Sequence, residues 1–501
     1  MMKTISPTRL AGATLVLSTV LSAVLTGGCT VGPDYHRPPV ATPAAWKELP
    51  GWTEAQPAAE APKGDWWTGF NDPLMDEFEP LVSVSNQTVR QSYANYQQAL
   101  AEVRLARSAL FPTIGVTGSA TRSRSSTGNF SSSLGGLAGA SSFQRINNAG
   151  SLEANASWAP DLWGLVRRNI EESAATAQAS QATLANATLS EQIALANAII
   201  DLRVTDANID LLTHTVDAFQ QSLRVVAEQD RAGTVPPSDL VSAQTQLESA
   251  QSSLIALGVA RAQNVHAIAV LVGKNPEELD IAQNTTLPTL PSIPVSVPST
   301  LLQRRPDIAA AERQMAAQNA AIGVAVAAYY PTISLSALDG FTQSPLAGLL
   351  HIGNYVWSLG GQATETLFDG GQRSAQVDAA KASYEAAVAS YRGTVLTAFQ
   401  GVENDLAGLR ILAQQSEVLE RAVRDATRGT EIARNEYQAG TVDFTTVATA
   451  QATQLNLQQT ALNVQQTRLL DAASLIGDLG GGWSDSELRD PRKPGQQSAS
   501  P

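Results

Sequence analysis

The sequence predicts a mainly α-helical fold with a smaller β part, built as two internal repeats. The segment Ala232-Gly233-Thr234-Val235 recurs as Ala439-Gly440-Thr441-Val442, at an offset of 207 residues. Each copy lies between two long runs that are rich in Ala and Gln and nearly free of Pro, which is typical of helices. Segments in which polar and apolar residues alternate precede each copy, as expected of strands. The chain is therefore predicted to contain two helical hairpins made to one plan, each with its own pair of strands.

The composition argues against several classes of protein. The 501 residues carry a net charge of −13, and phosphate binding needs a basic surface, so we expect no nucleic-acid partner. Aromatic residues make up only 5% of the chain, which favours thin helical assemblies over a bulky core. The four histidines are scattered, and the chain lacks a phosphate-cradling glycine loop and a nucleophile motif. We therefore expect neither an enzyme nor a metal or other cofactor.

The N-terminus has the pattern of a secretory signal. Two basic residues precede an apolar run from Leu10 to Leu25, and small residues then lead to Cys29, the only cysteine. This resembles a bacterial lipobox, although Thr26 stands where Leu is usual. We expect Cys29 to carry a covalent lipid, diacylglycerol plus an N-acyl chain such as palmitate. One such lipid anchor binds a protein to the membrane only marginally, so a second membrane contact is expected. No later run is long and apolar enough to predict a helix that spans the membrane.

The segment that follows Cys29 is predicted to be extended up to residue 72, because its many prolines prevent a helix. A helix is expected from Pro73 to about Leu110, with Asp72 as its N-cap. Four segments then show strand-like alternation, and the first and third begin alike, with Pro112-Thr113-Ile114 and Pro331-Thr332-Ile333. The expected membrane strands lie at about 112–123, 151–160, 331–340 and 354–366.

The run from Arg167 to Arg231 has neither Pro nor Gly and predicts one helix about 100 Å long, which does not fit inside a compact domain. The first AGTV turn and a helix from about Ser238 to Val272 follow it. The second repeat follows the same plan and ends at Leu479, before a glycine stop. The predicted divisions are a signal peptide (1–28), a lipidated extended segment (29–72), a first repeat (73–287), a Pro-rich connector (288–299), a second repeat (300–483) and a disordered tail (484–501).

Four strands per chain cannot close a barrel in a membrane by themselves. A sheet exposed to lipid must close, and single-chain barrels of the outer membrane have at least eight strands. Several chains would have to pool their strands, with polar faces toward water and apolar faces toward lipid. The alternative is a soluble strand pair in each repeat with one buried face. The polar set is Thr113, Thr117, Ser119, Glu153, Asn155, Ser157 and Ser334, and the apolar set is Ile114, Val116, Leu152, Trp158, Ile333 and Leu335.

Together, these motifs resemble the outer-membrane factors of tripartite RND-type efflux systems, in particular the nodulation-type subgroup of channel lipoproteins. The resemblance covers nearly the whole mature chain, and its specificity lies in the joint order of the motifs. They are Cys29 to Tyr35, Phe111-Pro112, both glycine turns, Arg304 to Ile308, Phe368 to Gly371 and Gly480 to Trp483.

The resemblance implies a homotrimer in the outer membrane of a Gram-negative bacterium, with a shared twelve-strand β-barrel and a periplasmic α-barrel of twelve helices. It also implies passive export of small molecules, as in multidrug resistance, driven by an inner-membrane RND-type pump through a periplasmic membrane-fusion adaptor. A duct for type I protein secretion shares this fold and stays an alternative. A periplasmic coiled-coil scaffold is another. The transported substrate cannot be read from the sequence.

The resemblance also locates a periplasmic gate at the hairpin tips. Ser238 and Asp239 match tip positions of the first repeat, and Tyr437 matches a tip tyrosine of the second. Threefold symmetry would bring three Asp239 carboxylates together, where like charges repel unless cations, protons or donors intervene. The alternative is that Asp239 is an N-terminal carboxylate stabilised by the helix dipole, with Ser238 or Asp239 capping the helix.

The second repeat departs from the family pattern at its tip. Thr446 and Thr449 stand where relatives often carry Asp, and Val442 stands where some carry Arg. The acidic ring is therefore expected to be thinner here, with Asp443 as a substitute, which puts cation selectivity in doubt. The turns themselves are expected to contact the adaptor or the pump through Gly233, Thr234, Val235, Gly440, Thr441 and Val442.

Overall fold

The fold is mainly helical with one four-stranded antiparallel sheet, as the sequence predicts. The computed structural model describes residues 30–43, 45–48, 65–125, 145–293, 298, 301–344 and 346–493. The expected signal peptide, Cys29 and most of the loop after the first strand lie outside these residues. The chain forms two compact units, one made of Met1–His36, Leu100–Ala175 and Ala316–Ala386, the other of Arg37–Ala99, Thr176–Met315 and Ala387–Pro501.

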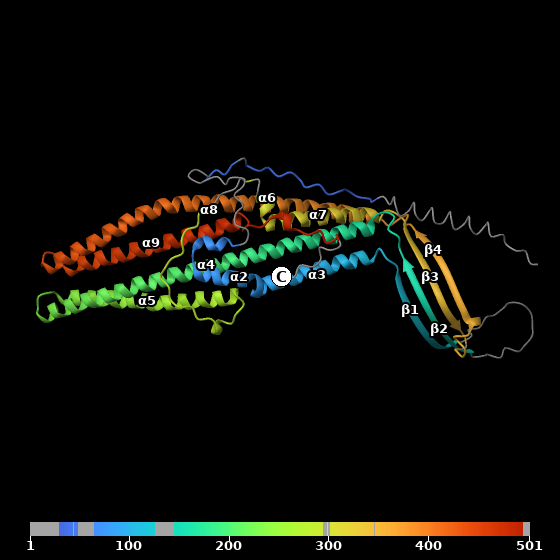
Figure 1. Cartoon of the computed structure of the whole chain (residues 1–501), viewed down its shortest axis with the longest axis horizontal. Helices are drawn as coiled ribbons and strands as arrows, with labels where there is room; N and C mark the ends of the chain where they lie inside the picture. The colour runs from blue at the N-terminus through green and yellow to red at the C-terminus, as the bar shows by residue number, and fades with distance from the viewer. Residues whose placement is uncertain are drawn as a thin grey trace, which may run out of the picture. The chain divides into compact units, whose positions relative to one another are not determined.

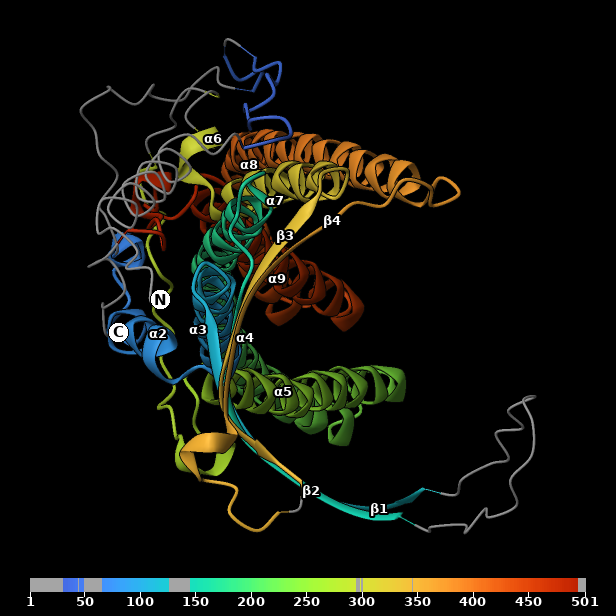
Figure 2. The ribbon, with the colours of Figure 1, turned by 90° about the vertical axis from the view of Figure 1, so that its right-hand side faces the viewer.

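The first unit contains the sheet, whose strands follow the order β1-β2-β3-β4 (Figures 1 and 2). Its strands are β1 (Thr113–Ser125), β2 (Arg145–Trp158), β3 (Thr332–Gln343) and β4 (Tyr355–Thr364), with a short 3-10 turn, η4 (Ile352–Asn354), before β4. β2 begins before the expected residue 151, because it pairs with β1 along the whole length of β1.

The alternation in the sequence becomes two chemically different faces of this sheet. Thr113 lies opposite Ser157, and their hydroxyl groups are hydrogen-bonded at 2.8 Å. Ile114, one residue further, lies opposite Ala156. Because residues opposite each other on neighbouring strands share a face, polar side chains gather on one face and apolar ones on the other.

One acidic residue lies on the apolar face. Asp339 of β3 is opposite Ala154, which is itself opposite Val116. Its Oδ1 accepts a hydrogen bond of 2.5 Å from the hydroxyl of Tyr355, at the start of β4. The tyrosine hydroxyl thereby gives this carboxylate a hydrogen-bond donor, which a polar group on an apolar face needs.

Two helical hairpins dominate the second unit (Figure 1). α4 (Leu165–Arg231) and α5 (Pro237–Leu271) form the first, and α8 (Gln372–Gln438) and α9 (Phe444–Asp478) form the second. Both long helices have 67 residues and both returning helices have 35, which supports the internal repeat. The shorter elements are η1 (Trp66–Phe70), α2 (Pro73–Ser85), α3 (Gln87–Ser108), η2 (Pro276–Glu278), α6 (Leu301–Arg304), α7 (Pro306–Ala327) and η5 (Asp485–Glu487).

The helix expected from Pro73 to Leu110 is in fact two helices, divided at Asn86. The Asn86 backbone is extended, with ψ at 132°, and its Oδ1 accepts hydrogen bonds from the N–H groups of Thr88 and Val89 at 2.8 and 3.1 Å. Its Nδ2 donates to Glu191 Oε2 and to the carbonyl of Leu271, both at 3.0 Å. An N-cap that is also bound to two other helices outweighs the helical propensity of the sequence around it.

The expectation that no later run is apolar enough to span a membrane as a helix is wrong for α5. A window of 18 residues in this helix has a mean hydropathy of 1.5, and only 17% of that window is buried. One side of α5 packs against α4, where Leu247 and Ala250 contact Val216 and Phe219. The apolar residues on its other sides are exposed, which shows that α5 has more apolar surface than its own hairpin covers.

The expectation of a disordered tail from residue 484 is wrong for residues 484–493. The carbonyls of Glu487 and Arg489 accept hydrogen bonds from Gln181 and Gln178 of α4, at 3.0 and 3.2 Å. The N–H of Arg489 returns a bond of 3.0 Å to Gln181 Oε1. Side-chain amides of α4, which is distant in the sequence, thus provide hydrogen-bond partners for the backbone of this segment. Residues 494–501 lie outside the described part of the chain.

In the Arg304 to Ile308 motif, the guanidinium of Arg305 connects two distant parts of the second unit. Arg305 binds both carboxylate oxygens of Asp307, at 3.0 and 2.8 Å. Its Nη1 also donates to the backbone carbonyl and to Oδ1 of Asp478, at 2.9 and 2.8 Å. The planar fork of an arginine suits such paired contacts, and lysine would not reproduce them. The motif therefore joins the start of the second repeat to the end of its last helix.

The Val31 to Tyr35 motif has a similar anchor in the first unit. Arg168 is only 3% exposed and donates to the carbonyls of Val31 and Gly32, at 3.1 and 3.2 Å, and to Asp34 at 2.9 Å. Gly32 has a φ of 91°, and a Cβ atom there would collide with the backbone of Gly323. A glycine is required at this position for both reasons. The chain directly after Cys29 is thus held against α4.

Candidate functional site

The two hairpin turns have the same hydrogen-bond pattern. In the first, Gly233 has a φ of 69°, its N–H donates to Asp230 O at 2.9 Å, and the N–H of Thr234 donates to Gln229 O at 2.9 Å. In the second, Gly440 has a φ of 72°, and Thr441 donates in the same way to Glu436 O at 3.0 Å. These are Schellman caps, which need a left-handed residue and so favour glycine.

Each turn also uses its threonine. The hydroxyl groups of Thr234 and Thr441 donate to the same carbonyls as their backbone N–H groups, both at 2.9 Å. The residues after them, Val235 and Val442, are half-buried, while the two glycines and threonines are exposed. The predicted contact residues therefore form two small, rigid and mostly exposed loops.

An apolar cluster joins the two hairpins directly behind the turns. It draws residues from all four helices, and Tyr437 is among the partly buried residues at its margin. We call it the tip cluster. Its buried members are Val226 of α4, Ala243 of α5, Ala433 of α8, and Phe444 and Val447 of α9.

Asp239 is buried beside this cluster, at 6% exposed. α5 begins at Pro237 with Pro236 as its N-cap, so Asp239 lies in the first helical turn, and the expectation that Ser238 or Asp239 caps the helix is wrong. Pro237 is well suited to the first helical position, and it places the start of the helix two residues before Asp239. The carboxylate then faces the positive end of the helix dipole. Ser238 is exposed.

Tyr437 crosses from the second hairpin to the first. Its hydroxyl group donates a hydrogen bond of 2.5 Å to Oε1 of Gln229, and its ring packs edge-on against Phe444 with centroids 5.6 Å apart. Burial raises the pKa of Tyr437, and the negative charge of Asp239 raises it further. The structure thus brings together two residues that the sequence selected, Asp239 and Tyr437, and one that it did not, Gln229. No local pattern distinguishes Gln229 from the many other glutamines of these helices.

The other selected residues of the second tip are exposed. Asp443 is the N-cap of α9, but its side chain accepts no capping hydrogen bond. Thr446 and Thr449 are exposed on the following turns, and the hydroxyl of Thr449 donates to Thr445 O at 2.8 Å. Within one chain, therefore, Asp239 is buried beside the tip cluster, Tyr437 is partly buried at its margin, and Asp443 remains on the surface. Among the described residues, no group of three or more His, Cys, Asp or Glu side chains is placed to hold a metal ion.

Comparison with known proteins agrees with this architecture. The profile of the family described as "Outer membrane efflux protein" matches residues 81–274 and 297–481. The probable efflux pump outer membrane protein TtgC of Pseudomonas putida is 28% identical over 93% of this chain and 96% of its own. Nodulation protein T of Rhizobium leguminosarum bv. trifolii is 27% identical over 87% and 90%. The solved outer-membrane channel OprN has a TM-score of 0.81 and 27% identity, and the match covers 91% of this chain and 100% of that one.

Proposed function

Because this chain belongs to the outer membrane efflux protein family and is an outer-membrane efflux channel, we propose that three copies form the exit duct of a tripartite pump. The duct carries small molecules passively, from a periplasmic adaptor and an inner-membrane RND-type pump to the outside. The energy for transport comes from the pump, since the sequence has no phosphate-cradling glycine loop that would bind a nucleotide.

One observation carries the proposal, namely the sheet with two open edges. Among the residues that the structure describes, β1 and β4 are each paired on one side only. In a hydrocarbon layer the free backbone groups of such edges cost several kcal/mol each, so the edges must meet other strands. Pairing β4 of one copy with β1 of the next removes both edges, and three copies give twelve strands.

The exposed apolar surface of α5 supports the same assembly. Val241, Ile255, Val259 and Val270 are between 60% and 74% exposed in one chain. Contiguous apolar surface on one element usually marks an interface. In a trimer this face of the first hairpin would pack against the second hairpin of a neighbouring copy and complete the tunnel wall.

We further propose that the hairpin tips form the gate and the adaptor contact. Asp239 and Tyr437 hold the two hairpins of one chain closed behind the turns, and Ser238 and Asp443 are exposed for contacts between copies. The two exposed Schellman turns meet the adaptor or the pump. The burial of Asp239 and the bond from Tyr437 to Gln229 support this assignment.

The same proposal includes a lipid on Cys29 and no other cofactor. Cys29 lies outside the described residues, but the chain two residues later is fixed, since the N–H of Val31 donates to Trp163 O at 3.1 Å. A lipid on Cys29 would therefore start from a defined position on the first unit. It adds to an anchor that the barrel supplies.

Native mass and particle outline test the proposal. The protein is solubilised in detergent and measured by light scattering, with negative-stain images of the same sample. We expect a trimer with a long hollow outline. A monomer that stays in solution without detergent would contradict the proposal and would favour a periplasmic scaffold.

A further inference from the structure

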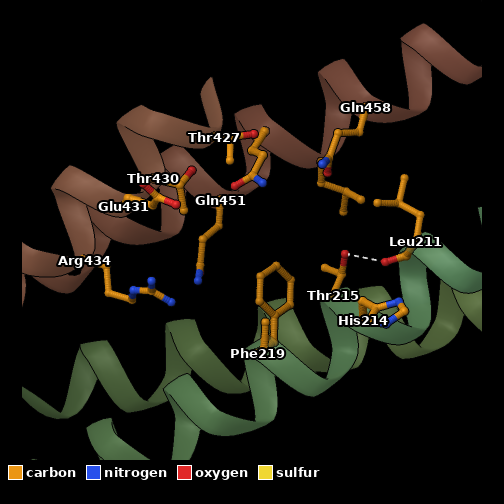
Figure 3. Close-up of a pocket in the computed structure, with 13 residues that line it drawn as sticks. Leu211, His214, Thr215, Phe219, Thr427, Thr430, Glu431, Arg434, Gln451 and Gln458 are labelled. Carbon is orange, nitrogen blue, oxygen red and sulfur yellow. Dashed lines mark hydrogen bonds between the residues drawn. The ribbon is translucent and has the colours of Figure 1, made fainter. Parts of the chain in front are cut away.

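A cavity of about 300 Å³ lies between the two hairpins of one chain, next to the tip cluster and on its side away from the turns. Figure 3 shows it between α4 on one side and α8 and α9 on the other. The volume is at the lower end of the range of small-molecule sites. We call it the hairpin cavity. It is lined by Leu211, His214, Thr215, Ala218 and Phe219 of α4, Thr427, Thr430, Glu431 and Arg434 of α8, and Gln451, Gln454, Leu455 and Gln458 of α9.

Contacts on both sides hold the walls of the hairpin cavity apart. Toward the turns, the tip cluster joins all four helices, and Gln246 of α5 donates to Ala448 O of α9 at 2.9 Å. Away from the turns, Gln466 of α9 donates to Asp201 of α4 at 2.7 Å. The hairpins are thus fixed to each other at both ends of the cavity, so the walls cannot collapse to fill it.

The lining has an apolar base. The ring of Phe219 is 6% exposed and points into the space between the hairpins (Figure 3). Leu211 and Leu455 contribute from α4 and α9. These side chains suit a flat apolar body, and its transfer from water would be favourable.

The polar groups of the lining include acceptors as well as the amide N–H donors of three glutamines. Oε1 of Gln451 is buried and has no hydrogen-bond partner among the described residues. The hydroxyl protons of three lining threonines are used within their own helices, at 2.8 to 3.0 Å, so that only lone pairs remain for a guest. These bonds run from Thr215 to Leu211 O at 2.8 Å, from Thr427 to Val423 O at 2.8 Å and from Thr430 to Ala426 O at 3.0 Å.

The charged residues of the lining do not favour a charged guest. Glu431 and Arg434 lie one turn apart on α8, carry opposite charges and are exposed. His214 is exposed as well, and its Nδ1 is 2.9 Å from the carbonyl of Asp210. The net charge around the opening is therefore close to zero, and the buried part has no ionised group.

We propose that the hairpin cavity binds an uncharged aromatic molecule that carries an N–H or O–H donor, with the rings on Phe219 and the donor on Oε1 of Gln451. A buried amide oxygen without a partner costs free energy, and a donor from the guest would recover it. This site is separate from the Asp239–Tyr437 pair, and binding there does not depend on the gate assignment.

N-phenyl-1-naphthylamine is a suitable probe, because it has two aromatic groups, one N–H donor and no charge at neutral pH. The dye is titrated into the full-length protein held in amphipol, and its fluorescence is recorded. The signal from dye that partitions into the amphipol rises linearly with dye concentration, whereas the signal from dye bound to a site saturates. We expect saturation at one dye per chain. A purely linear signal with the wild-type protein would mean that the cavity holds water only, and would overturn the proposal.

Substitutions assign the site. Ala218→Phe fills the cavity and should abolish the saturable signal, while Ala452→Phe, on an exposed position of α9 outside the lining, should leave it unchanged. Gln451→Leu removes the acceptor and should weaken dye binding about tenfold, the usual effect of leaving one donor unpaired. Gln459→Leu is the matched control. Equal affinity in Gln451→Leu and the wild-type protein would remove Gln451 from the site.

A second ligand keeps the test valid if Ala218→Phe does not fold. In 1-benzylnaphthalene a CH₂ group replaces the N–H of the dye, and its affinity is measured by competition. We expect it to bind the wild-type protein and Gln451→Leu equally, whereas the dye distinguishes them. A tenfold difference for both ligands would show that Gln451→Leu changes the cavity itself and that the N–H contact is absent.

Discussion

The phenol of Tyr437 donates a hydrogen bond of 2.5 Å to the side-chain oxygen of Gln229, a residue 208 positions earlier in the chain. This bond joins the last turn of α8 to the last turn of α4, so it links the two hairpins where both begin to reverse. Its donor ring also packs on Phe444 of α9. The side chain of Tyr437 therefore contacts both α4 and α9. The negative charge of Asp239 on α5 also raises the pKa of Tyr437.

Tyr437→Phe should increase the ion conductance of the purified channel in planar bilayers. The variant keeps the ring on Phe444 but removes the hydroxyl, so Gln229 loses its partner and the two hairpins are free to separate. The expected weakening is about 1 kcal/mol per chain. Tyr384→Phe, elsewhere on α8, is the matched control and should behave as the wild-type protein. Equal conductance in all three proteins would show that the bond does not hold the tip closed.

Asp239→Ala should also increase conductance and should reduce the preference for cations. The substitution removes a buried carboxylate beside the tip cluster and, in a trimer, three charges at once. Asp443→Ala serves as the comparison, because Asp443 is exposed. An Asp239→Ala channel with unchanged conductance and unchanged ion preference would remove Asp239 from the gate. A loss of cation preference in Asp443→Ala alone would assign selectivity to the second tip.

Cys29→Ser should give a protein without lipid that still assembles in the outer membrane. One acyl-type anchor contributes little beside a closed barrel, so the barrel is expected to hold the protein in place. Mass spectrometry of the mature chain and membrane fractionation measure the two parts of this prediction. Recovery of Cys29→Ser as a soluble periplasmic protein would mean that the sheet does not enter the membrane.

Glu79→Gln should make the thermal stability of the protein less dependent on pH. Glu79 of α2 is fully buried, and neither of its carboxylate oxygens has a hydrogen-bond partner among the described residues. Desolvation raises its pKa to about 9, from 4.5 in water. Between these values the folded protein keeps a proton that the unfolded chain releases, so the free energy of unfolding falls as pH rises, by about 1.4 kcal/mol per pH unit for one such group.

Melting temperatures at pH 5.5 and pH 8.5 check this prediction. The wild-type protein should lose more stability between the two values than Glu79→Gln does. Glu77→Gln, an exposed position on the same helix, is the matched control and should follow the wild-type protein. The same pH dependence in Glu79→Gln and the wild-type protein would show that Glu79 does not carry the proton.

The sequence by itself determined the features that depend on neighbouring residues. Helical runs free of Pro and Gly, glycine at the two turns and alternation in the strands are local properties, and they predicted the repeat, the hairpins and the faces of the sheet. The tip residues Asp239 and Tyr437 were selected through a resemblance to a family, and the structure places them together. Their roles in a gate stay predictions.

Only the tertiary structure decided the features that need partners far along the chain. Asn86 divides a predicted helix because Glu191 and Leu271 bind its side chain. Residues 484–493 are ordered because Gln178 and Gln181 satisfy their backbone. Oε1 of Gln451 has no hydrogen-bond partner in the described part of the chain, because the two hairpins are separated at the hairpin cavity. Such contacts depend on how the helices and strands pack, and composition and periodicity do not encode this packing. Where a tertiary contact and the local propensity of the sequence disagree, the tertiary contact decides the structure.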